Sequence, residues 1–414
     1  MDREQKKVLL LAMKAGEIML SSGSEVYRVE DTIDRICHAC ALPYVECFIT
    51  TTALTVSLGS PEEDGEIDTV VRRIKNIGVD LERVSQVHAF VRGFSKGEIS
   101  VDEGFEILQR IERTPVFRLP VRLLGVMLVS FFFTLMSGGS LVDAAFSLLA
   151  GTSAYLLSLG IARLKINRFI SVFASCFLCA GIAFLCYLTG WVSSMSSMIV
   201  GGIIVFLPGV AITNAARDLL SGDMLSGVAR VAQSLLTAIA IAGGVGFLLG
   251  LVHLGLNADT FTQYLLPLQF LFGMLGTLGI SLVVNIPRRY LVPASLISAC
   301  GYLTITQLLL MGIPHILACF VAACVVALIA EILTHITKEA ASLFIVPAIF
   351  PLVPGVGLYN TMMSLLRDDL SAAGETGVEA IFIAGSIAVA LLVVISLTRV
   401  LSAIYNGIFH KNRA

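Results

Sequence analysis

The feature that most constrains this chain is a series of apolar runs, each near 20 residues long, which begins at residue 119. A helix of about 20 apolar residues crosses the hydrocarbon core of a bilayer. We count ten such runs, so the sequence predicts ten transmembrane helices. They lie near 120–138, 141–162, 169–189, 195–213, 227–252, 265–286, 291–310, 315–335, 341–360 and 379–402.

Charged residues divide the chain into two unequal parts. Residues 1–118 hold 35 of the 58 Asp, Glu, Lys and Arg residues, although the chain has 414 residues in all. This split excludes a uniformly soluble enzyme and a disordered chain. The net charge of −2 provides no basic patch, so nucleic acid is not expected as a partner. We predict a polar domain at 1–118, followed by a membrane domain.

Positive charges indicate how the membrane domain is oriented. The stretch at 8–13 is too short and too soon interrupted by charge to be the apolar core of a signal peptide. Loops and turns after the even-numbered runs carry positive charge, whereas only Arg367 lies on the other side. The positive-inside rule therefore predicts that both termini are cytoplasmic, as an even number of spans requires. The positive residues are Arg163, Lys165, Arg168, Arg217, Arg288, Arg289 and Lys338, with Lys411 and Arg413 at the C-terminus.

The polar domain has the pattern of a small α+β fold. Amphipathic spacing and caps predict helices at 4–20, 25–41, 80–95 and 101–113, and β-rich composition predicts strands at 44–58 and 67–75. The domain contains no Ser/His/Asp set, phosphate-binding loop or metal quartet. Cys37 and Cys40 could form half of a zinc site, but no second ligand pair follows at the required spacing. We therefore predict no catalytic residue, metal or cofactor.

Two polar clusters stand out in this domain. Glu25, Arg28 and Glu30 lie near the start of the second predicted helix, and Thr51 lies at the centre of a run of three threonines in an apolar strand. One interpretation is a polar site between helix and strand. The other is that Glu25 and Arg28 form an ordinary i,i+3 ion pair and that the threonines satisfy strand preference.

An internal repeat is the most informative pattern in the membrane domain. Residues 199–223 and 345–369 align without a gap at an offset of 146, with ten identities in 25 positions. At this offset the first run falls on the sixth, which gives two halves of five spans, at 119–264 and 265–414. Because five is odd, the second half begins on the opposite side of the membrane, and the two halves are inverted. Inverted repeats with interrupted helices are typical of secondary transporters.

The repeated residues predict broken helices and a substrate site. Proline removes a backbone donor and glycine permits unusual dihedrals, so the helices should break near Pro208 and Pro354. The freed backbone groups and two asparagines could then bind a polar solute, or the prolines could serve packing alone. The predicted substrate-binding residues are Pro208, Gly209, Asn214, Pro354, Gly355 and Asn360.

Three acidic residues are candidates for proton coupling or gating. Asp223 and Asp369 repeat at the same offset, and the alternative is that they cap helix ends. Glu331 lies inside the eighth run, where a buried carboxylate is a functional candidate, although it could reach water or pair with Lys338. A carboxylate substrate would need a cation such as Arg230, whose head could instead snorkel to the cytoplasmic interface.

Three stretches together resemble the threonine/serine exporter family: residues 22–30 (SGSEVYRVE), residues 48–54 (FITTTAL) and the repeated Pro-Gly-Val…Asn motif. The resemblance covers essentially the whole chain. It implies a polar N-terminal domain followed by ten spans, and export of threonine and serine driven by the proton motive force. Some split relatives are linked to dicarboxylates such as succinate. It also implies that Glu25, Arg28, Glu30 and Thr51 are functionally constrained.

The repeat and the resemblance favour a secondary exporter in the plasma membrane over an enzyme. The expected partners are an amino acid or a dicarboxylate, protons and the lipid bilayer; homo-oligomerisation is left open. One alternative is an exporter of C4-dicarboxylates such as succinate. Another is a membrane-anchored enzyme with a hydrolase-like N-terminal domain, and a third is a channel or sensor. An anchor would need no inverted repeat, which counts against the enzyme.

Overall fold

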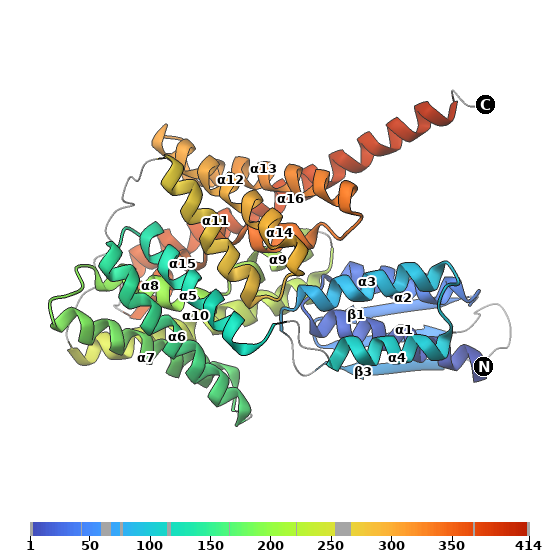
Figure 1. The fold of residues 1–414 in the computed structure, drawn as a ribbon, viewed down its shortest axis with the longest axis horizontal. Coiled ribbons are helices and arrows are strands. Elements are labelled where there is room, and N and C mark those ends of the chain that lie inside the picture. Colours follow the sequence, from blue (N-terminus) through green and yellow to red (C-terminus); the bar gives the residue numbers. More distant parts are fainter. Residues whose placement is uncertain are drawn as a thin grey trace.

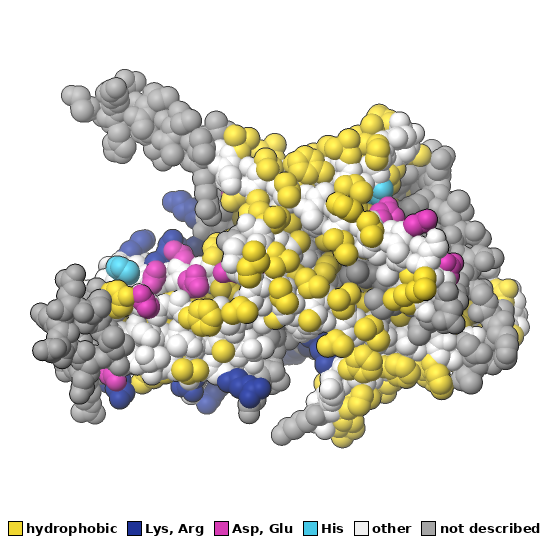
Figure 2. Space-filling view, turned by 180° about the vertical axis from the view of Figure 1, so that it is seen from behind, with side chains coloured by type: hydrophobic (Ala, Val, Ile, Leu, Met, Phe, Trp, Pro, Cys, Tyr) yellow, Lys and Arg dark blue, Asp and Glu magenta, His cyan; other side chains and the backbone are white. Residues whose placement is uncertain are grey.

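The computed structural model describes residues 3–42, 44–58, 68–74, 78–113, 117–164, 166–220, 222–252, 266–366 and 369–411. Within these residues the chain is mostly helical, and it forms a small α+β domain beside a large helical bundle (Figure 1). Charged side chains gather on the small domain, whereas apolar side chains cover the face of the bundle seen in Figure 2. The predicted combination of an α+β domain with an apolar helical domain is confirmed.

The N-terminal domain consists of four helices and an antiparallel sheet in the order β1-β2-β3. Helices α1 and α2 pack against the sheet, and α3 and α4 pack against α1. Alternation along β2 buries Leu54, Val56 and Leu58 in the domain core. The elements are α1 (Arg3–Ser21), α2 (Val26–Ala39), β1 (Val45–Thr50), β2 (Ala53–Leu58), β3 (Asp68–Arg73), α3 (Leu81–Ser95) and α4 (Val101–Arg113).

The strand predicted at 44–58 was wrong, because this segment is a hairpin of two strands. Thr50 pairs with Ala53, so Thr51 and Thr52 form the turn rather than the middle of a strand. The segment contains no Gly, Pro or Asn between its apolar residues, and the turn therefore leaves no mark in the pattern. Its length was the available signal, since 15 residues far exceed a typical strand of about 5–6 residues.

The bundle contains the long helices and two interrupted segments. The long helices are α5 (Leu119–Met136), α6 (Leu141–Arg163), α7 (Arg168–Leu188), α10 (Met224–Val252), α11 (Leu266–Val283), α12 (Leu291–Leu310), α13 (His315–Thr337) and α16 (Leu370–Lys411). The interrupted segments are α8 (Met195–Ile203), η1 (Ile204–Phe206) and α9 (Gly209–Leu220), then α14 (Ser342–Ala348), η3 (Phe350–Leu352) and α15 (Gly355–Leu366). A short η2 (Arg288–Tyr290) precedes α12.

Eight helices among the described residues are long and apolar enough to cross a bilayer. The pair Met195–Phe206 and Ala211–Leu220, which bends by 53°, supplies a ninth span if it is counted as one. The apolar helix Ser342–Leu352 is shorter than a full span. The chain is therefore a multi-pass membrane protein, and the predicted total of ten requires that both interrupted segments cross.

The helix breaks predicted near Pro208 and Pro354 are confirmed. Both broken segments contain a 3₁₀ turn, then an extended residue, then the proline and a new helix. The extended residues are Leu207 (φ −62°, ψ 131°) and Val353 (φ −74°, ψ 138°). A proline ring disfavours helical dihedrals in the residue before it, which explains why each helix stops there.

The offset of 146 residues also appears in the arrangement of the helices. The segments η1 and η3, α9 and α15, and the starts of α10 and α16 are each separated by 146 positions. Contacts repeat in the same way: α9 packs on α10 and α16, and α15 packs on α16 and α10. Helices α5 and α11, which open the two halves, pack against each other at the centre (Figure 1).

Candidate functional site

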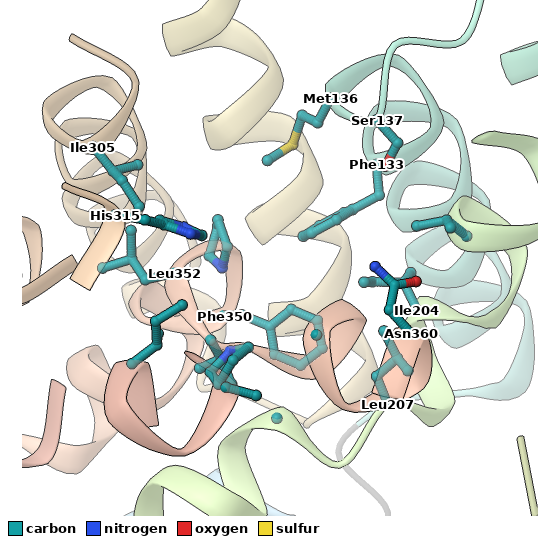
Figure 3. Close-up of a pocket in the computed structure, with 18 of the residues that line it drawn as sticks. Phe133, Met136, Ser137, Ile204, Leu207, Ile305, His315, Phe350, Leu352 and Asn360 are labelled. Atoms are coloured by element: carbon teal, nitrogen blue, oxygen red, sulfur yellow. The ribbon is translucent and has the colours of Figure 1, made fainter. Parts of the chain in front are cut away.

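A cavity of about 370 Å³ lies between the two broken segments. Gly209 and Pro354 line it at the breaks, and Asn360 lines it from the second turn of α15 (Figure 3). Residues of α5, α12, α13 and α16 complete the wall. The volume is at the small end of the range for pockets that bind small molecules.

The cavity wall is largely apolar, with few polar groups. Aromatic and aliphatic side chains such as Phe133 and Phe350 form most of it (Figure 3). One titratable pair lies in the wall, where His315 Nδ1 is 2.9 Å from Glu379 Oε1. The lining residues that the structure describes include no Lys or Arg. The other polar lining side chains are Ser137, Ser196, Ser197, Tyr302, Thr306, Asn360 and Thr376.

The cavity lies toward the end of the bundle away from the N-terminal domain. It is lined by Met136 at the end of α5, Leu309 at the end of α12 and His315 at the start of α13. The N-terminal domain instead contacts the opposite helix ends, at Val284 after α11 and Lys338 after α13. The cavity and the N-terminal domain are thus at opposite ends of the helices.

Three of the six predicted substrate-binding residues line this cavity: Gly209, Pro354 and Asn360. Pro208 and Gly355 adjoin the breaks, and Pro208 is not among the described lining residues. Asn214, the repeat partner of Asn360, is buried with 9% exposure in α9, outside the wall. The cavity wall therefore contains Gly209, Pro354 and Asn360, whereas Asn214 lies elsewhere in the bundle.

The predicted coupling residues lie apart from the cavity. Asp369 Oδ1 accepts a hydrogen bond from the Ala372 backbone N–H at the start of α16, so it caps a helix. Asp223 lies just before α10. Glu331 is buried in α13, and no pairing with Lys338 is found among the described residues.

The predictions missed His315 and Glu379. Both were placed at the first residue of a predicted span, at 315 and 379, where a polar residue looks like a boundary. Helix α16 begins at Leu370, so Glu379 lies nearly three turns inside it. The span was bounded by hydropathy alone, which put its start at Glu379. Extending the helix toward residue 370 would have placed this carboxylate inside it and identified it as a candidate.

The polar pattern at residues 22–30 lies at the interface between the domains. Glu25 forms ion pairs with Arg28 and with Arg217 of α9, across 192 positions of sequence. The side chains of Glu25 and Arg217 are only 5% and 7% exposed. Arg217 was predicted to lie in a cytoplasmic turn, but it lies within α9 and contacts the N-terminal domain. Both interpretations of Glu25 were incomplete. The i,i+3 pair with Arg28 exists, but Glu25 also binds Arg217 across the contact between the domains.

A second ion pair extends this interface. Arg230 Nε of α10 lies 2.8 Å from Asp218 Oδ2 of α9, and Arg230 Nη2 donates to the Ser24 carbonyl at 3.4 Å. The side chain of Arg230 is 13% exposed, so its head is paired inside the protein rather than extended into solvent. Thr51 is also buried, whereas Tyr27 remains partly exposed.

A separate set of contacts joins α3 to the ends of the membrane helices. The Leu81 backbone N–H donates to the Val284 carbonyl at 3.2 Å, and Asn285 Nδ2 donates to Asp80 Oδ2 at 3.2 Å. Ser85 Oγ donates to the buried Glu339 Oε2 at 2.9 Å. The two domains are therefore joined at α9 and α10 in one half and after α11 and α13 in the other.

The environment of Glu25 keeps it ionised. Burial by itself raises the pKa of this carboxyl, but Arg217 and Arg28 outweigh burial and lower the pKa to about 2. The neighbouring Glu30 behaves differently, because burial and the charge of Asp223 raise its pKa. Glu25 is thus a permanent anion at physiological pH.

A pH prediction follows from this depressed pKa. A carboxyl whose pKa is lowered in the folded state stabilises it above the unfolded pKa of 4.5, and this contribution is lost as the pH falls toward about 2. We expect no inflection from Glu25 between about pH 5 and 8. The pH–rate curve of Glu25→Gln transport should therefore keep the shape of the wild-type curve; a lost inflection in that range would contradict the prediction.

Sequence comparison relates this chain to known proteins. Residues 10–252, more than half of the chain, match the model of a family described as "Putative threonine/serine exporter". Residues 269–397 match a second family model, described as "Threonine/Serine exporter, ThrE". The chain belongs to the threonine/serine exporter family. The resemblance predicted from its motifs is confirmed.

Individual relatives of this exporter family carry transport names. A probable threonine/serine exporter of Mycobacterium tuberculosis is 26% identical over 91% of this chain and 73% of its own length. A threonine/serine exporter of Corynebacterium glutamicum is also 26% identical, over 63% of this chain and 53% of that protein. A probable succinate transporter subunit of Escherichia coli is 23% identical, over 58% of this chain and 93% of that subunit. No solved structure matches the chain significantly.

Proposed function

We propose that this protein is a secondary exporter of threonine and serine in the plasma membrane. The observation that carries the proposal is a cavity between two helix breaks that recur at an offset of 146 residues. Unwound backbone within membrane-spanning helices needs a polar partner, such as a solute in a cavity. The proposed topology has ten spans, with α8–α9 and α14–α15 as the broken ones and inverted halves at 119–264 and 265–414.

The proposed orientation places both termini and the N-terminal domain in the cytoplasm, as the charge distribution predicts. The cavity, at the other end of the bundle, would then face the exterior. In alternating access, the two halves rock about a central site, so that it opens to each side in turn. This conformation would correspond to the state from which the substrate is released.

The chemistry of the cavity favours an amino acid over a dicarboxylate. The Asn360 side chain and freed backbone N–H groups can bind one carboxylate, and Glu379 can bind an ammonium group. A dicarboxylate would place two negative charges against a described wall without Lys or Arg, with only His315 to offset them. Succinate is the named cargo of a more distant relative and is our second candidate.

Proton coupling is proposed for Glu331. Its carboxyl is buried in α13, away from the described ion pairs, and intramembrane carboxylates serve as proton sites in many transporters. Asp223 and Asp369 are proposed to act at the ends of α10 and α16, where they limit movement of the helices after the breaks. An enzymatic role for the N-terminal domain has less support, since relatives are named as transporters.

Counterflow in proteoliposomes tests the proposal. Liposomes loaded with unlabelled threonine should accumulate labelled threonine and serine, and labelled succinate should accumulate much less. Dissipating an imposed pH gradient should lower net export. No counterflow of threonine or serine by well-folded protein would overturn the substrate assignment, and gradient-independent export would overturn proton coupling.

A further inference from the structure

We propose that Asn214, Arg217, Asp218 and Arg230 form a cytoplasm-facing binding site for the carboxylate and ammonium groups of the substrate, and that Glu25 occupies this site in the present conformation. The inference rests on the proposed exporter function and assigns a site to the cytoplasmic side. Glu25 is then a tethered carboxylate that competes with the substrate.

The position of the cluster on α9 connects it to the cavity. Gly209, the first residue of α9, lines the cavity, and Arg217 contacts Glu25 eight residues further on. A rise of 1.5 Å per residue separates these two positions by about 12 Å along the helix axis. Asn214 lies between them, one turn before Arg217 and Asp218 and on the same face of the helix. One helix thus runs from the cavity to the N-terminal domain.

The internal repeat relates the cluster to the cavity wall. Asn360, Thr376 and Glu379 line the cavity, and subtraction of 146 from their numbers gives Asn214, Arg230 and Gln233. In a transporter with inverted repeats, equivalent positions in the two halves form the pathways to opposite sides. The cluster therefore occupies the counterpart of the cavity, and Ser24 and Glu25 of the N-terminal domain cover it.

The closed interface contains buried polar atoms without hydrogen bonds. Among the described residues, Ser22 Oγ, Ser24 Oγ and Arg217 Nη2 are buried and lack a hydrogen-bond partner. Asp218 Oδ2 and Arg230 Nε are 2.8 Å apart, yet their geometry does not meet that of a hydrogen bond. Unsatisfied buried groups cost free energy, which weakens this contact and favours its exchange for a ligand that satisfies them.

The chemistry of the cluster fits a zwitterion. The Arg217 guanidinium already binds one carboxylate, that of Glu25, and retains an unused buried N–H group. Asp218, which is 3% exposed, can accept hydrogen bonds from an ammonium group. Asn214 supplies both an amide donor and a carbonyl acceptor for the remaining polar atoms of the amino acid.

The two halves differ at these positions in a way that suits export. Met363 and Ser364 occupy the positions that correspond to Arg217 and Asp218. The cytoplasmic site therefore has two arginines, Arg217 and Arg230, whereas the described cavity wall has none. An exporter benefits from tighter binding on the cytoplasmic side and weaker binding on the side of release.

The first test measures threonine affinity from the cytoplasmic side. In proteoliposomes with the N-terminal domain facing outward, Glu25→Gln should lower the half-saturating threonine concentration about tenfold, because the competing anion is removed. Adding Arg217→Gln to Glu25→Gln should abolish this gain. The exposed Glu106→Gln in α4 is the matched control and should leave affinity unchanged. Unchanged or weaker affinity for threonine in Glu25→Gln would overturn the proposal, even if the maximal transport rate rose.

The second test needs no substitution. Threonine should displace Glu25 in the wild-type protein, so amide hydrogen exchange at residues 22–30 should rise with threonine concentration. Threoninol, which lacks the carboxylate, should not produce this rise. Equal exchange with and without threonine would overturn the inference, while counterflow in the same preparation shows independently whether the exporter function holds.

Discussion

Asn360→Ala together with Asn214→Ala is expected to lower threonine counterflow about ten- to hundredfold. Asn360 lines the cavity, and Asn214 is its buried counterpart beside Arg217. Loss of a hydrogen bond to a charged group costs about 1.5–3 kcal/mol, and each 1.4 kcal/mol corresponds to a factor of ten. The initial rate at a substrate concentration below half-saturation measures the effect.

Each single variant should weaken substrate binding on a different side of the membrane. Asn214→Ala should raise the half-saturating concentration on the cytoplasmic side, and Asn360→Ala should do so mainly on the other side. Thr304→Ala is a suitable control, since Thr304 bonds to the Cys300 carbonyl within α12 and is outside the cavity wall. Wild-type transport by the double variant would remove the proposed site.

Gly279→Ala is expected to destabilise the membrane domain by about 1–3 kcal/mol, the usual cost of overpacking. A Cβ atom at position 279 would lie 2.6 Å from the Gly125 carbonyl oxygen, and one at position 125 would lie 2.7 Å from the Gly279 carbonyl oxygen. The backbones of α5 and α11 touch here, where the first helices of the two halves meet. Small residues allow such close approach between membrane helices.

The thermal midpoint of purified protein in detergent measures this effect. Gly181→Ala in α7 is the matched control, because a Cβ atom there meets no atom within 4 Å and alanine favours a helix more than glycine does. We expect a lower midpoint for Gly279→Ala and an unchanged or higher one for Gly181→Ala. Equal midpoints for the two variants would contradict the close contact between α5 and α11.

Much of the fold could be predicted because it depends on local patterns. Apolar length predicted the long helices, and the prolines at 208 and 354 predicted both breaks, since each proline constrains the residue directly before it. The length of the segment at 44–58 favoured two strands, but the position of the turn at Thr51 and Thr52 could not be predicted, because these residues carry no turn signal and the hairpin is stabilised by packing on α1 and α2.

The candidate site was predicted only in part. The repeat identified Asn360 and Gly209, which line the cavity, but not the pair His315 and Glu379, which are 64 positions apart. The polar cluster near the start of the second predicted helix singled out Glu25 without its partner Arg217, because nothing local links the start of one domain to a helix in another.

The sequence by itself determined the apolar segments, the division into a polar and a membrane domain, the repeat offset and the helix breaks. These depend on side-chain hydropathy and on dihedral limits that act within a few residues. Only the tertiary structure decided that the cavity lies at one end of the bundle and that Glu25 pairs with Arg217 at the other. Both depend on which distant helices pack together, and ion pairs such as Glu25–Arg217 form only when packing excludes water and brings the charges into contact.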